Sequence, residues 1–223
     1  MSEEIWSQVD HYLADLFTPP DPLLDAVLAS SAAAGLPEIQ VPPHQGKLLQ
    51  LMAQMCGAKR ILELGTLGGY STIWMARALP PDGKMVTLEY EPAHAAVAKA
   101  NFERAGLSSK IDLRVGAALA TLPQLEADGS GPFDLIFLDA DKENYPNYLS
   151  WCLKLSHPGT IFIADNIVRN GAVIDPDSSD PRVQGVREFN ALVAQESRLC
   201  ATAIQMVGSK GYDGFIVARV VEG

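Results

Sequence analysis

The feature that most constrains the fold is an alternation, from Arg60 onward, between short apolar runs and longer stretches of helical periodicity. The apolar runs, which we interpret as strands, lie at 60–64, 85–90, 111–115, 134–139 and 160–165, and the helices between them at about 70–79, 92–105, 117–126 and 145–156. Strands that are joined through a helix pair in parallel, and such connections are right-handed. Five of these units in series predict an open, doubly wound α/β sheet.

The two ends of the chain add different elements to this sheet. After a helix at about 182–197, strands at 201–207 and 214–221 are joined by a connection short enough for an antiparallel hairpin. Before the sheet, helices at about 3–16, 22–34 and 43–56 are expected to cover it. A chain of 223 residues with 48% hydrophobic content is expected to bury one core. We therefore expect residues 1–223 to form one domain, with 1–57 as a helical cover and 58–223 as the core.

The charge and residue composition limit the kinds of molecule that this protein is expected to bind. A formal net charge of -10 argues against nucleic acid, whose binding depends on clustered Lys and Arg, and favours a small organic substrate. The acidic start lacks a signal peptide and no run approaches 18 apolar residues, so a cytoplasmic protein without a membrane partner is expected. Three widely spaced cysteines and four scattered histidines predict free thiols and structural imidazoles, not a zinc site.

Carboxylates follow two of the predicted strands directly. Asp139 ends the fourth strand, and Asp165 and Asn166 end the fifth. Neighbouring parallel strands lie about 4.8 Å apart, so the two acids would meet at one edge of the sheet, where their repulsion calls for a proton or a cation. Two carboxylates and an amide oxygen suit a hard divalent ion such as Mg²⁺, Mn²⁺ or Ca²⁺. The ordinary alternative is that these acids are helix caps or turn residues.

The turn after the first strand is rich in glycine and leads into a helix. Its glycines, which begin at Gly65, do not follow the dinucleotide-binding pattern, and Glu63 places a carboxylate where a pyrophosphate would otherwise lie. An ammonium or sulfonium group would be attracted there, while a ligand carboxylate could bind the helix N-terminus near Ser71. The turn therefore favours a cationic ligand over a phosphate.

The ends of the next two strands suit a nucleoside. Glu89 ends the second strand, where an acid can accept hydrogen bonds from ribose hydroxyls. Small residues at 116–118 follow the third strand and could contact an adenine. Each signal alone is weak, because a glycine turn is often mere packing and Glu89 could be a solvated strand end. Taken in order, the signals describe S-adenosylmethionine.

Several segments together resemble the cation-dependent class I O-methyltransferases, the family of catechol O-methyltransferase and caffeoyl-CoA O-methyltransferase with their small bacterial relatives. The resemblance covers about residues 40–220 and is carried by Leu62-Glu-Leu-Gly-Thr-Leu-Gly-Gly-Tyr-Ser71, by the block 133–145, by Ala164-Asp-Asn166 and by Tyr212-Asp-Gly-Phe215. It implies a seven-stranded Rossmann-like sheet, mostly parallel with an antiparallel last strand, and often a homodimer. Two departures, at His157 and around Gly211, affect only loop shape.

The resemblance also implies roles for individual residues. Lys142 would be the general base, and Asp139 and Asn170 would contact the substrate. The metal would be held by Asp139, Asp165 and Asn166, and S-adenosylmethionine by Val41, Glu63, Gly65, Thr66, Ser71, Glu89, Ala118 and Asp141. Taken without the family, Lys142 reads as a solvated lysine paired with Asp141 or Glu143.

The predicted function is divalent-metal-dependent methyl transfer from S-adenosylmethionine to a hydroxyl of a catechol-like or caffeoyl-type phenol, with Mg²⁺ as the first choice of metal. Three alternatives stay open at this point. They are a methyltransferase acting on a hydroxylated uridine of tRNA, an NAD-dependent oxidoreductase on fold alone, and a catalytically silent protein that only binds the cofactor.

Overall fold

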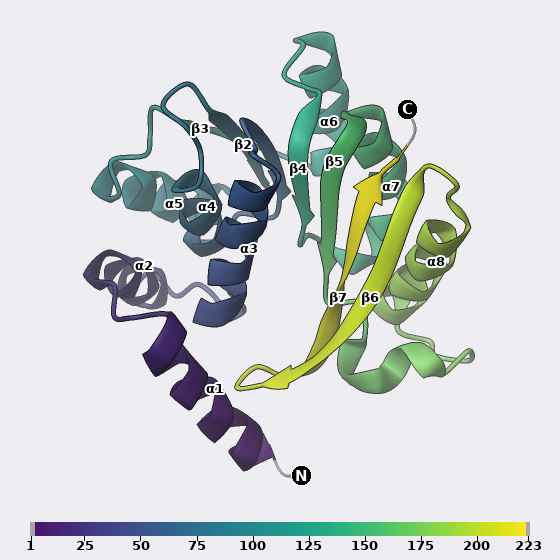
Figure 1. The fold of residues 1–223 in the computed structure, drawn as a ribbon, viewed down its shortest axis with the longest axis horizontal. Coiled ribbons are helices and arrows are strands. Elements are labelled where there is room, and N and C mark those ends of the chain that lie inside the picture. Colours follow the sequence, from purple (N-terminus) through teal and green to yellow (C-terminus); the bar gives the residue numbers. More distant parts are fainter. Residues whose placement is uncertain (1–2, 222–223) are drawn as a thin grey trace.

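The computed structural model describes residues 3–221, and a seven-stranded sheet forms its centre (Figure 1). The strands are β1 (Arg60–Leu64), β2 (Lys84–Glu89), β3 (Ile111–Val115), β4 (Phe133–Leu138), β5 (Ser156–Asp165), β6 (Leu199–Gly208) and β7 (Gly211–Val220). Their order is β3-β2-β1-β4-β5-β7-β6; β1 to β5 are parallel, and β7 runs antiparallel to both of its neighbours. The predicted doubly wound sheet with a terminal antiparallel hairpin is confirmed.

Helices cover both faces of the sheet. They are α1 (Glu3–Phe17), α2 (Pro22–Ala33), α3 (Pro43–Met55), α4 (Tyr70–Ala76), α5 (Pro92–Arg104), α6 (Ala118–Ala127), α7 (Tyr145–Lys154) and α8 (Pro181–Gln195), with short 3₁₀ helices η1 (Lys142–Asn144) and η2 (Arg169–Ile174). Alternate residues of a strand point to opposite faces. Accordingly Leu62 of β1 packs in the cluster under α6, α7 and α8, whereas Ile61 packs in the cluster under α2 to α5.

The fifth strand begins earlier than the sequence predicted. β5 starts at Ser156 and includes a segment that we expected to be a loop, although it contains Pro158. The Thr160 hydroxyl donates to the Phe133 carbonyl (2.6 Å) and accepts from the His157 amide (3.0 Å), so side-chain bonds hold this segment to β4. The β4–β5 register shifts at the same place, which is where a proline is tolerated in a sheet.

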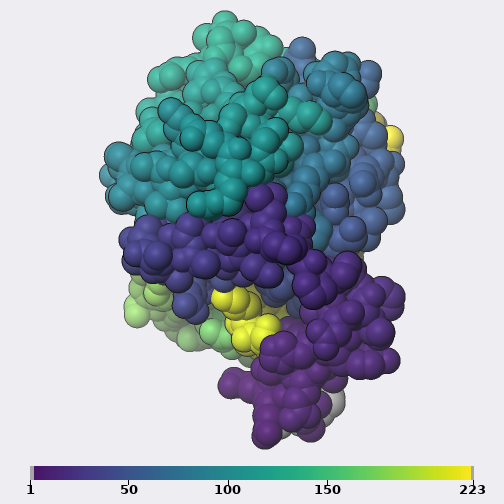
Figure 2. Space-filling model, turned by 90° about the vertical axis from the view of Figure 1, so that its left-hand side faces the viewer, coloured from purple at the N-terminus to yellow at the C-terminus, as the bar shows by residue number. Residues whose placement is uncertain are grey.

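The N-terminal helices divide into two kinds. Helices α2 and α3 bury Leu24, Val27 and Leu49 in the core, as expected for a cover. Helix α1 buries no residue and projects from the body beside the tip of the β6–β7 hairpin (Figures 1 and 2). Within residues 3–221, none of the helices combines the length and the apolar character needed to cross a membrane.

Candidate functional site

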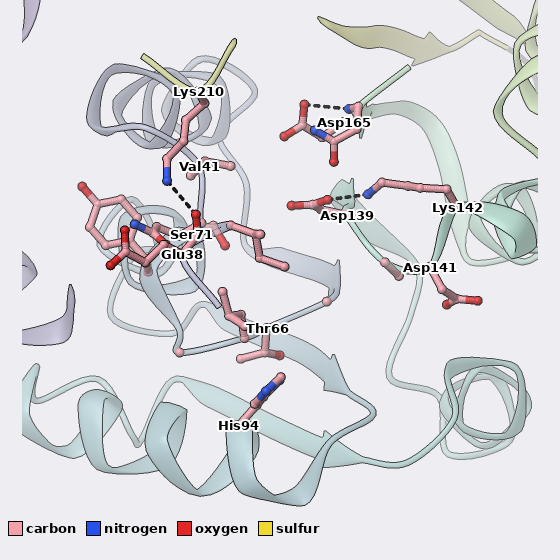
Figure 3. A pocket seen from close by; sticks show the side chains of 18 of the residues that line it. Glu38, Val41, Thr66, Ser71, His94, Asp139, Asp141, Lys142, Asp165 and Lys210 are labelled. Atoms are coloured by element: carbon pink, nitrogen blue, oxygen red, sulfur yellow. Dashed lines mark hydrogen bonds and ion pairs between the residues drawn. The ribbon is translucent and has the colours of Figure 1, made fainter. Parts of the chain in front are cut away.

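The carboxyl ends of β1, β2, β4 and β5 open into a cavity of about 1290 Å³. Strands β1 and β4 are neighbours, and the chain leaves them toward opposite faces of the sheet, so the crevice lies at the switch point where doubly wound proteins bind ligands. The segment 36–45 and the tip of the β6–β7 hairpin complete the wall. Lys210 of this tip donates to the Glu38 carbonyl (2.8 Å), and this bond joins the two segments of the wall (Figure 3).

The two strand-end acids meet at this cavity. Leu138 pairs with Ala164 in the β4–β5 register, so Asp139 and Asp165 follow at adjacent positions. Asp165 is almost fully buried, and its Oδ2 accepts a hydrogen bond from Gln45 Nε2 (2.7 Å). Burial, and then the charge of Asp139, raise the pKa of Asp165 to about 7. The predicted pair of interacting carboxylates is therefore present in the structure.

A divalent cation fits the groups beside this pair. Asn166 lines the cavity with a backbone φ of 59°, a conformation that Asn tolerates better than most residues. Its side-chain amide forms no hydrogen bond with residues 3–221, so its oxygen is free to bind a ligand. That part of the chain holds no group of three or more His, Cys, Asp and Glu suited to a metal, so this would be a site of two carboxylates and one amide. Such an oxygen set suits Mg²⁺.

Lys142 is held beside the acid pair instead of in solvent (Figure 3). Its Nζ lies 2.7 Å from Asp139 Oδ1 and donates to the Tyr145 hydroxyl at 2.9 Å. The fully buried Tyr145 oxygen is also within hydrogen-bond distance of the carbonyl oxygens of Leu138 (3.1 Å) and Asp165 (3.0 Å). Burial and the charge of Asp139 keep the pKa of Tyr145 well above its usual value, so the phenol stays neutral. Lys142 is therefore aimed by two fixed partners, neither of which is Asp141 or Glu143.

The glycine-rich turn lies where the cavity floor needs the chain to bend tightly. Gly65 has a φ of 98°, and a Cβ on it would collide with the Asp139 carbonyl oxygen. Glycine is therefore required both by the backbone conformation and by the close approach of β1 to β4. Thr66 and Ser71, at either end of this turn, line the cavity, and their contact with a cofactor remains a prediction.

Glu63 lies behind the cavity wall. It has no exposed surface, and its carboxylate accepts hydrogen bonds from the hydroxyls of Ser71 (2.6 Å), Thr72 (2.5 Å) and Thr87 (2.6 Å). Burial raises the pKa of Glu63 to about 7, against the opposing effect of these donors. A ligand cannot touch Glu63 in this arrangement, so the predicted role would be exerted through Ser71, which does face the cavity.

Glu89 both lines the cavity and orders the turn. Its Oε2 accepts from the backbone N–H groups of Leu67 (2.7 Å) and Thr66 (3.2 Å), and its Oε1 from that of Glu91 (2.9 Å). A carboxylate has about four acceptor positions, and His94 Nδ1 lies 3.4 Å from Oε1 at the fourth, so a ribose hydroxyl would bind there in competition with the imidazole.

The remaining predicted cofactor residues also lie on the cavity wall. Val41, Ala118 and Asp141 are all among the lining residues. The Tyr148 hydroxyl donates to Asp141 (2.5 Å) and holds that carboxylate in place.

Asn170 is the predicted site residue that lies furthest from this arrangement. It is exposed and outside the lining set, whereas its neighbour Arg169 is part of the wall. Both residues have a positive φ, so the chain turns sharply here. The substrate contact predicted for Asn170 remains a prediction, at the rim of the cavity beside Gly211.

Comparison with known proteins identifies the class. A family model described as O-methyltransferase matches residues 19–219. A catechol O-methyltransferase of Niastella koreensis is 55% identical over 220 residues, which are 99% of this chain and 100% of that protein. This chain belongs to the O-methyltransferase family. The O-methyltransferase family also supplies close structural relatives. One from Bacillus cereus, in complex with SAH, has a TM-score of 0.97 at 55% identity and covers 98% of this chain and 100% of its own.

A second solved O-methyltransferase extends the comparison. TomG from Streptomyces achromogenes, in complex with SAM, has a TM-score of 0.95 at 47% identity, and the match covers 99% of both chains. The family predicted from the sequence is confirmed, and the chain is an enzyme that methylates oxygen. Its membership rules against an NAD-dependent oxidoreductase.

Three residues of the site were not anticipated from the sequence. Gln45 lies on a helix that we read only as cover, and its spacing gives no sign of a contact with Asp165. Tyr145 could have been inferred, because it stands one helical turn after Lys142 within the most specific motif. Arg169 follows Asn166 by three residues, and only the local backbone turns it inward.

Proposed function

We propose that this O-methyltransferase transfers the methyl group of S-adenosylmethionine to one hydroxyl of a vicinal aromatic diol, of the catechol or caffeoyl type, with the help of a divalent cation. One observation carries the proposal: Lys142, Asp139 and Asp165 line the same cavity as the glycine-rich turn. A methyl donor at the turn and a diol at the acid pair would then be in contact. The names of the relatives, catechol and caffeoyl-CoA O-methyltransferase, support the substrate class.

The cofactor would lie along the ends of β1, β2 and β4. Its methionine part would bind at the turn and at Ser71, and its ribose at Glu89. The full set of residues proposed to bind it is Val41, Glu63, Gly65, Thr66, Ser71, Glu89, Ala118 and Asp141, with Glu63 acting through Ser71.

The metal would be held by Asp139, Asp165 and Asn166. When bound there, a divalent cation lowers the pKa of a substrate hydroxyl and offers positions for both diol oxygens. Without a cation, Asp165 is a buried acid whose pKa is raised to about 7. Ionising both Asp139 and Asp165 near neutral pH is therefore energetically unfavourable. A cation relieves that repulsion, and this is the physical support for metal dependence.

Lys142 would take the proton from the reacting hydroxyl. Its Nζ is fixed by Asp139 and Tyr145 at the edge where the diol would bind. To accept the proton, Lys142 must hold a neutral amine, and a divalent cation beside Asp139 would favour that form by repelling the ammonium. The chain then has to hold the phenolate oxygen in line with the methyl carbon and the sulfur. The walls formed by the turn and by β4 and β5 supply that orientation.

A tRNA substrate has less support than a small phenol. The residues that line the cavity include nine Asp and Glu but only four Lys and Arg, and a polyphosphate backbone would be repelled by such a wall. We therefore place a small molecule in the cavity. We also propose a homodimer, with the exposed face of α1 as its contact, and a cytoplasmic location stays a prediction from the sequence.

Transfer of labelled methyl from S-adenosylmethionine to a panel of catechols and caffeoyl esters tests the function. We expect turnover with Mg²⁺ and its loss with EDTA, and Lys142→Ala should lower kcat by about 10²- to 10⁴-fold with little change in cofactor affinity. Lys154→Ala, which alters a surface lysine, is the matched control. Full turnover in EDTA would refute the metal, and cofactor binding without methylation of any phenol would favour the silent binding protein.

A further inference from the structure

Within the described residues 3–221, one cation of the cavity wall has no hydrogen-bond or ion-pair partner. The four Lys and Arg residues of the wall are Lys142, Arg169, Arg182 and Lys210. Lys142 pairs with Asp139, Arg182 with Asp180, and Lys210 with the Glu38 carbonyl. Within residues 3–221 the guanidinium of Arg169 forms neither an ion pair nor a hydrogen bond, although acids are the commonest charged residues of this wall. A flexible cation in such surroundings would be expected to lie against one of them.

Part of this guanidinium is buried without compensation. Arg169 is half-buried, and its Nε is shielded from solvent and has no acceptor. A buried donor without a partner typically costs about 1–3 kcal/mol. The side chain therefore gains free energy if it turns toward an acceptor that enters the cavity.

The backbone at Arg169 is fixed in an unusual conformation. Arg169 has a φ of 56°, in the left-handed region that an arginine seldom adopts. Asp213 Oδ1 accepts hydrogen bonds from the N–H groups of Val168 (2.9 Å), Arg169 (3.1 Å) and Gly214 (2.9 Å), which holds the segment in this shape. The strain is thus stabilised by a dedicated side chain, and its consequence is that Arg169 faces the cavity.

The position of Arg169 relates it to the substrate end of the cavity. It lies three residues after Asn166 and shares the wall with Asp139 and Asp165. Its charge is also close enough to act on Tyr145, whose hydroxyl accepts from Lys142. An anionic group that reaches Arg169 would be carried by the molecule whose hydroxyls lie at the acid pair.

We propose that Arg169 binds a carboxylate of the substrate, so that the enzyme prefers dihydroxy aromatic acids to neutral diols. This inference rests on the proposed function. The planar guanidinium matches a carboxylate with two parallel hydrogen bonds, and within residues 3–221 no acid forms an ion pair with it. The other Lys and Arg residues of the wall already have partners, so Arg169 is the cation to which a substrate carboxylate would bind.

Matched substrate pairs test the assignment. We would measure kcat and KM for 3,4-dihydroxybenzoate against 3,4-dihydroxybenzamide, and for caffeate against its amide, with S-adenosylmethionine and Mg²⁺. In the wild-type enzyme we expect KM to be at least tenfold lower for each acid. Arg169→Gln should raise KM for the acids by about 10- to 100-fold, leave kcat nearly constant and leave the amides unaffected, and Arg169→Lys should restore part of the preference.

Arg198→Gln removes a charge outside the cavity and serves as the matched control. We expect it to leave KM unchanged for the acids and for the amides. Equal KM values for acids and amides in the wild-type enzyme would overturn the role of Arg169. An equal rise in KM for acids and amides in Arg169→Gln would overturn it too. The wild-type comparison of acids with amides tests the carboxylate preference even if Arg169→Gln does not fold. Absence of turnover with these four diols and with the catechols and caffeoyl esters of the panel above would instead overturn the proposed function.

Discussion

Opposing effects act on the protonation of the Asp165 side chain. Burial and the nearby Asp139 raise the pKa of its carboxyl to about 7, whereas hydrogen bonds from Gln45 and from the Asn166 backbone favour its ionised form. Gln45 is itself buried and belongs to α3, so a helix outside the Rossmann-like core orients a residue proposed to bind metal. Partners of this kind fix ligand direction and commonly affect metal affinity.

Gln45→Leu is therefore predicted to weaken metal binding. Loss of the amide leaves Asp165 Oδ2 without its donor in a buried place, which costs about 1–3 kcal/mol of stability and lets the carboxylate rotate. We expect about 10- to 100-fold weaker Mg²⁺ binding, measured by calorimetry and by the Mg²⁺ dependence of the melting temperature. Gln50→Leu on the same helix is the control. Unchanged Mg²⁺ affinity in Gln45→Leu would show that Asp165 needs no support from α3.

Among individual residues, the sequence predicted the side chains at the strand ends. It missed those that contact the strand ends from distant parts of the chain. Asp139 and Asp165 could be placed side by side because parallel register carries them there. Gln45 is 120 positions from its partner, and no local rule relates the two. Glu63 was predicted at the right strand, but its direction depends on three hydroxyls that only the packed structure brings together.

At the scale of elements, the turn between β1 and α4 is the most tightly constrained. Gly65→Ala is predicted to destabilise the protein more than Gly57→Ala. Both glycines have positive φ, but a Cβ at Gly57 meets nothing within 4 Å, whereas one at Gly65 meets the backbone of Asp139. The conformational cost is roughly 1–2 kcal/mol at each position, and Gly65 adds a steric clash that separates β1 from β4.

Thermal unfolding with and without S-adenosylmethionine provides the measurement. Gly57→Ala isolates the conformational cost, so the difference between the two variants reports the clash at Gly65. We expect Gly65→Ala to have the lower melting temperature and weaker stabilisation by the cofactor. Equal melting temperatures would mean that β1 and β4 can separate without cost.

The early start of β5 produces a pH-dependent contact at the opposite end of the sheet. Asp134 of β4 accepts from the backbone N–H groups of Lys59 and Arg60, both at 2.8 Å, and its other oxygen lies 2.9 Å from His157 Nε2. His157 Nδ1 faces the Pro158 carbonyl oxygen at 2.8 Å. Both ring nitrogens therefore face acceptors, which favours the doubly protonated imidazolium. The Pro158 carbonyl and then Asp134 raise the pKa of His157 above 6.5.

A raised histidine pKa stabilises the folded state at pH values below the unfolded pKa of about 6.5, and this stabilisation disappears as the pH rises through the folded pKa. His157→Gln should thus lower the melting temperature more at pH 5.5 than at pH 8.5. The effect should stay below about 1 kcal/mol because the pair is partly exposed. His11→Gln, an exposed histidine of α1, is the control. The same loss at both pH values would contradict the assignment.

At the scale of the whole molecule, the parallel direction of β1 to β5 and the terminal hairpin could be predicted, because the pattern of strands and connecting helices is visible in the sequence, whereas the position of β7 between β5 and β6 was not. Apolar runs of β1, β2 and β4 alternate with helices, and the short 208–211 connection forces β6 and β7 to be antiparallel. The route of the chain outside the sheet could not be derived in the same way. Helices α1 and α3 were both predicted to cover the sheet, yet α1 buries no residue whereas α3 packs into the core.

The exposed face of α1 has a regular pattern. Ile5, Val9, Tyr12 and Leu16 follow one another at steps of four, three and four residues and form a single stripe along the helix. Their exposed fractions are 46%, 48%, 64% and 56%, although an amphipathic helix gains stability by burying such a stripe. Helix α1 projects beyond the body, so this stripe is open to a second molecule (Figure 2).

We expect a second copy of this chain to cover the stripe. In a twofold dimer the same patch meets itself, and an uncharged apolar stripe is complementary to its own copy. Light scattering during size-exclusion chromatography should give twice the 24.0 kDa mass of the chain, and Tyr12→Glu combined with Leu16→Glu should give a monomer. Ile174→Glu alters a single exposed hydrophobic residue away from α1 and should leave the dimer intact. A wild-type monomer at micromolar concentration would leave the stripe to a partner of another kind, and a dimer that survives both substitutions would place the contact on another face.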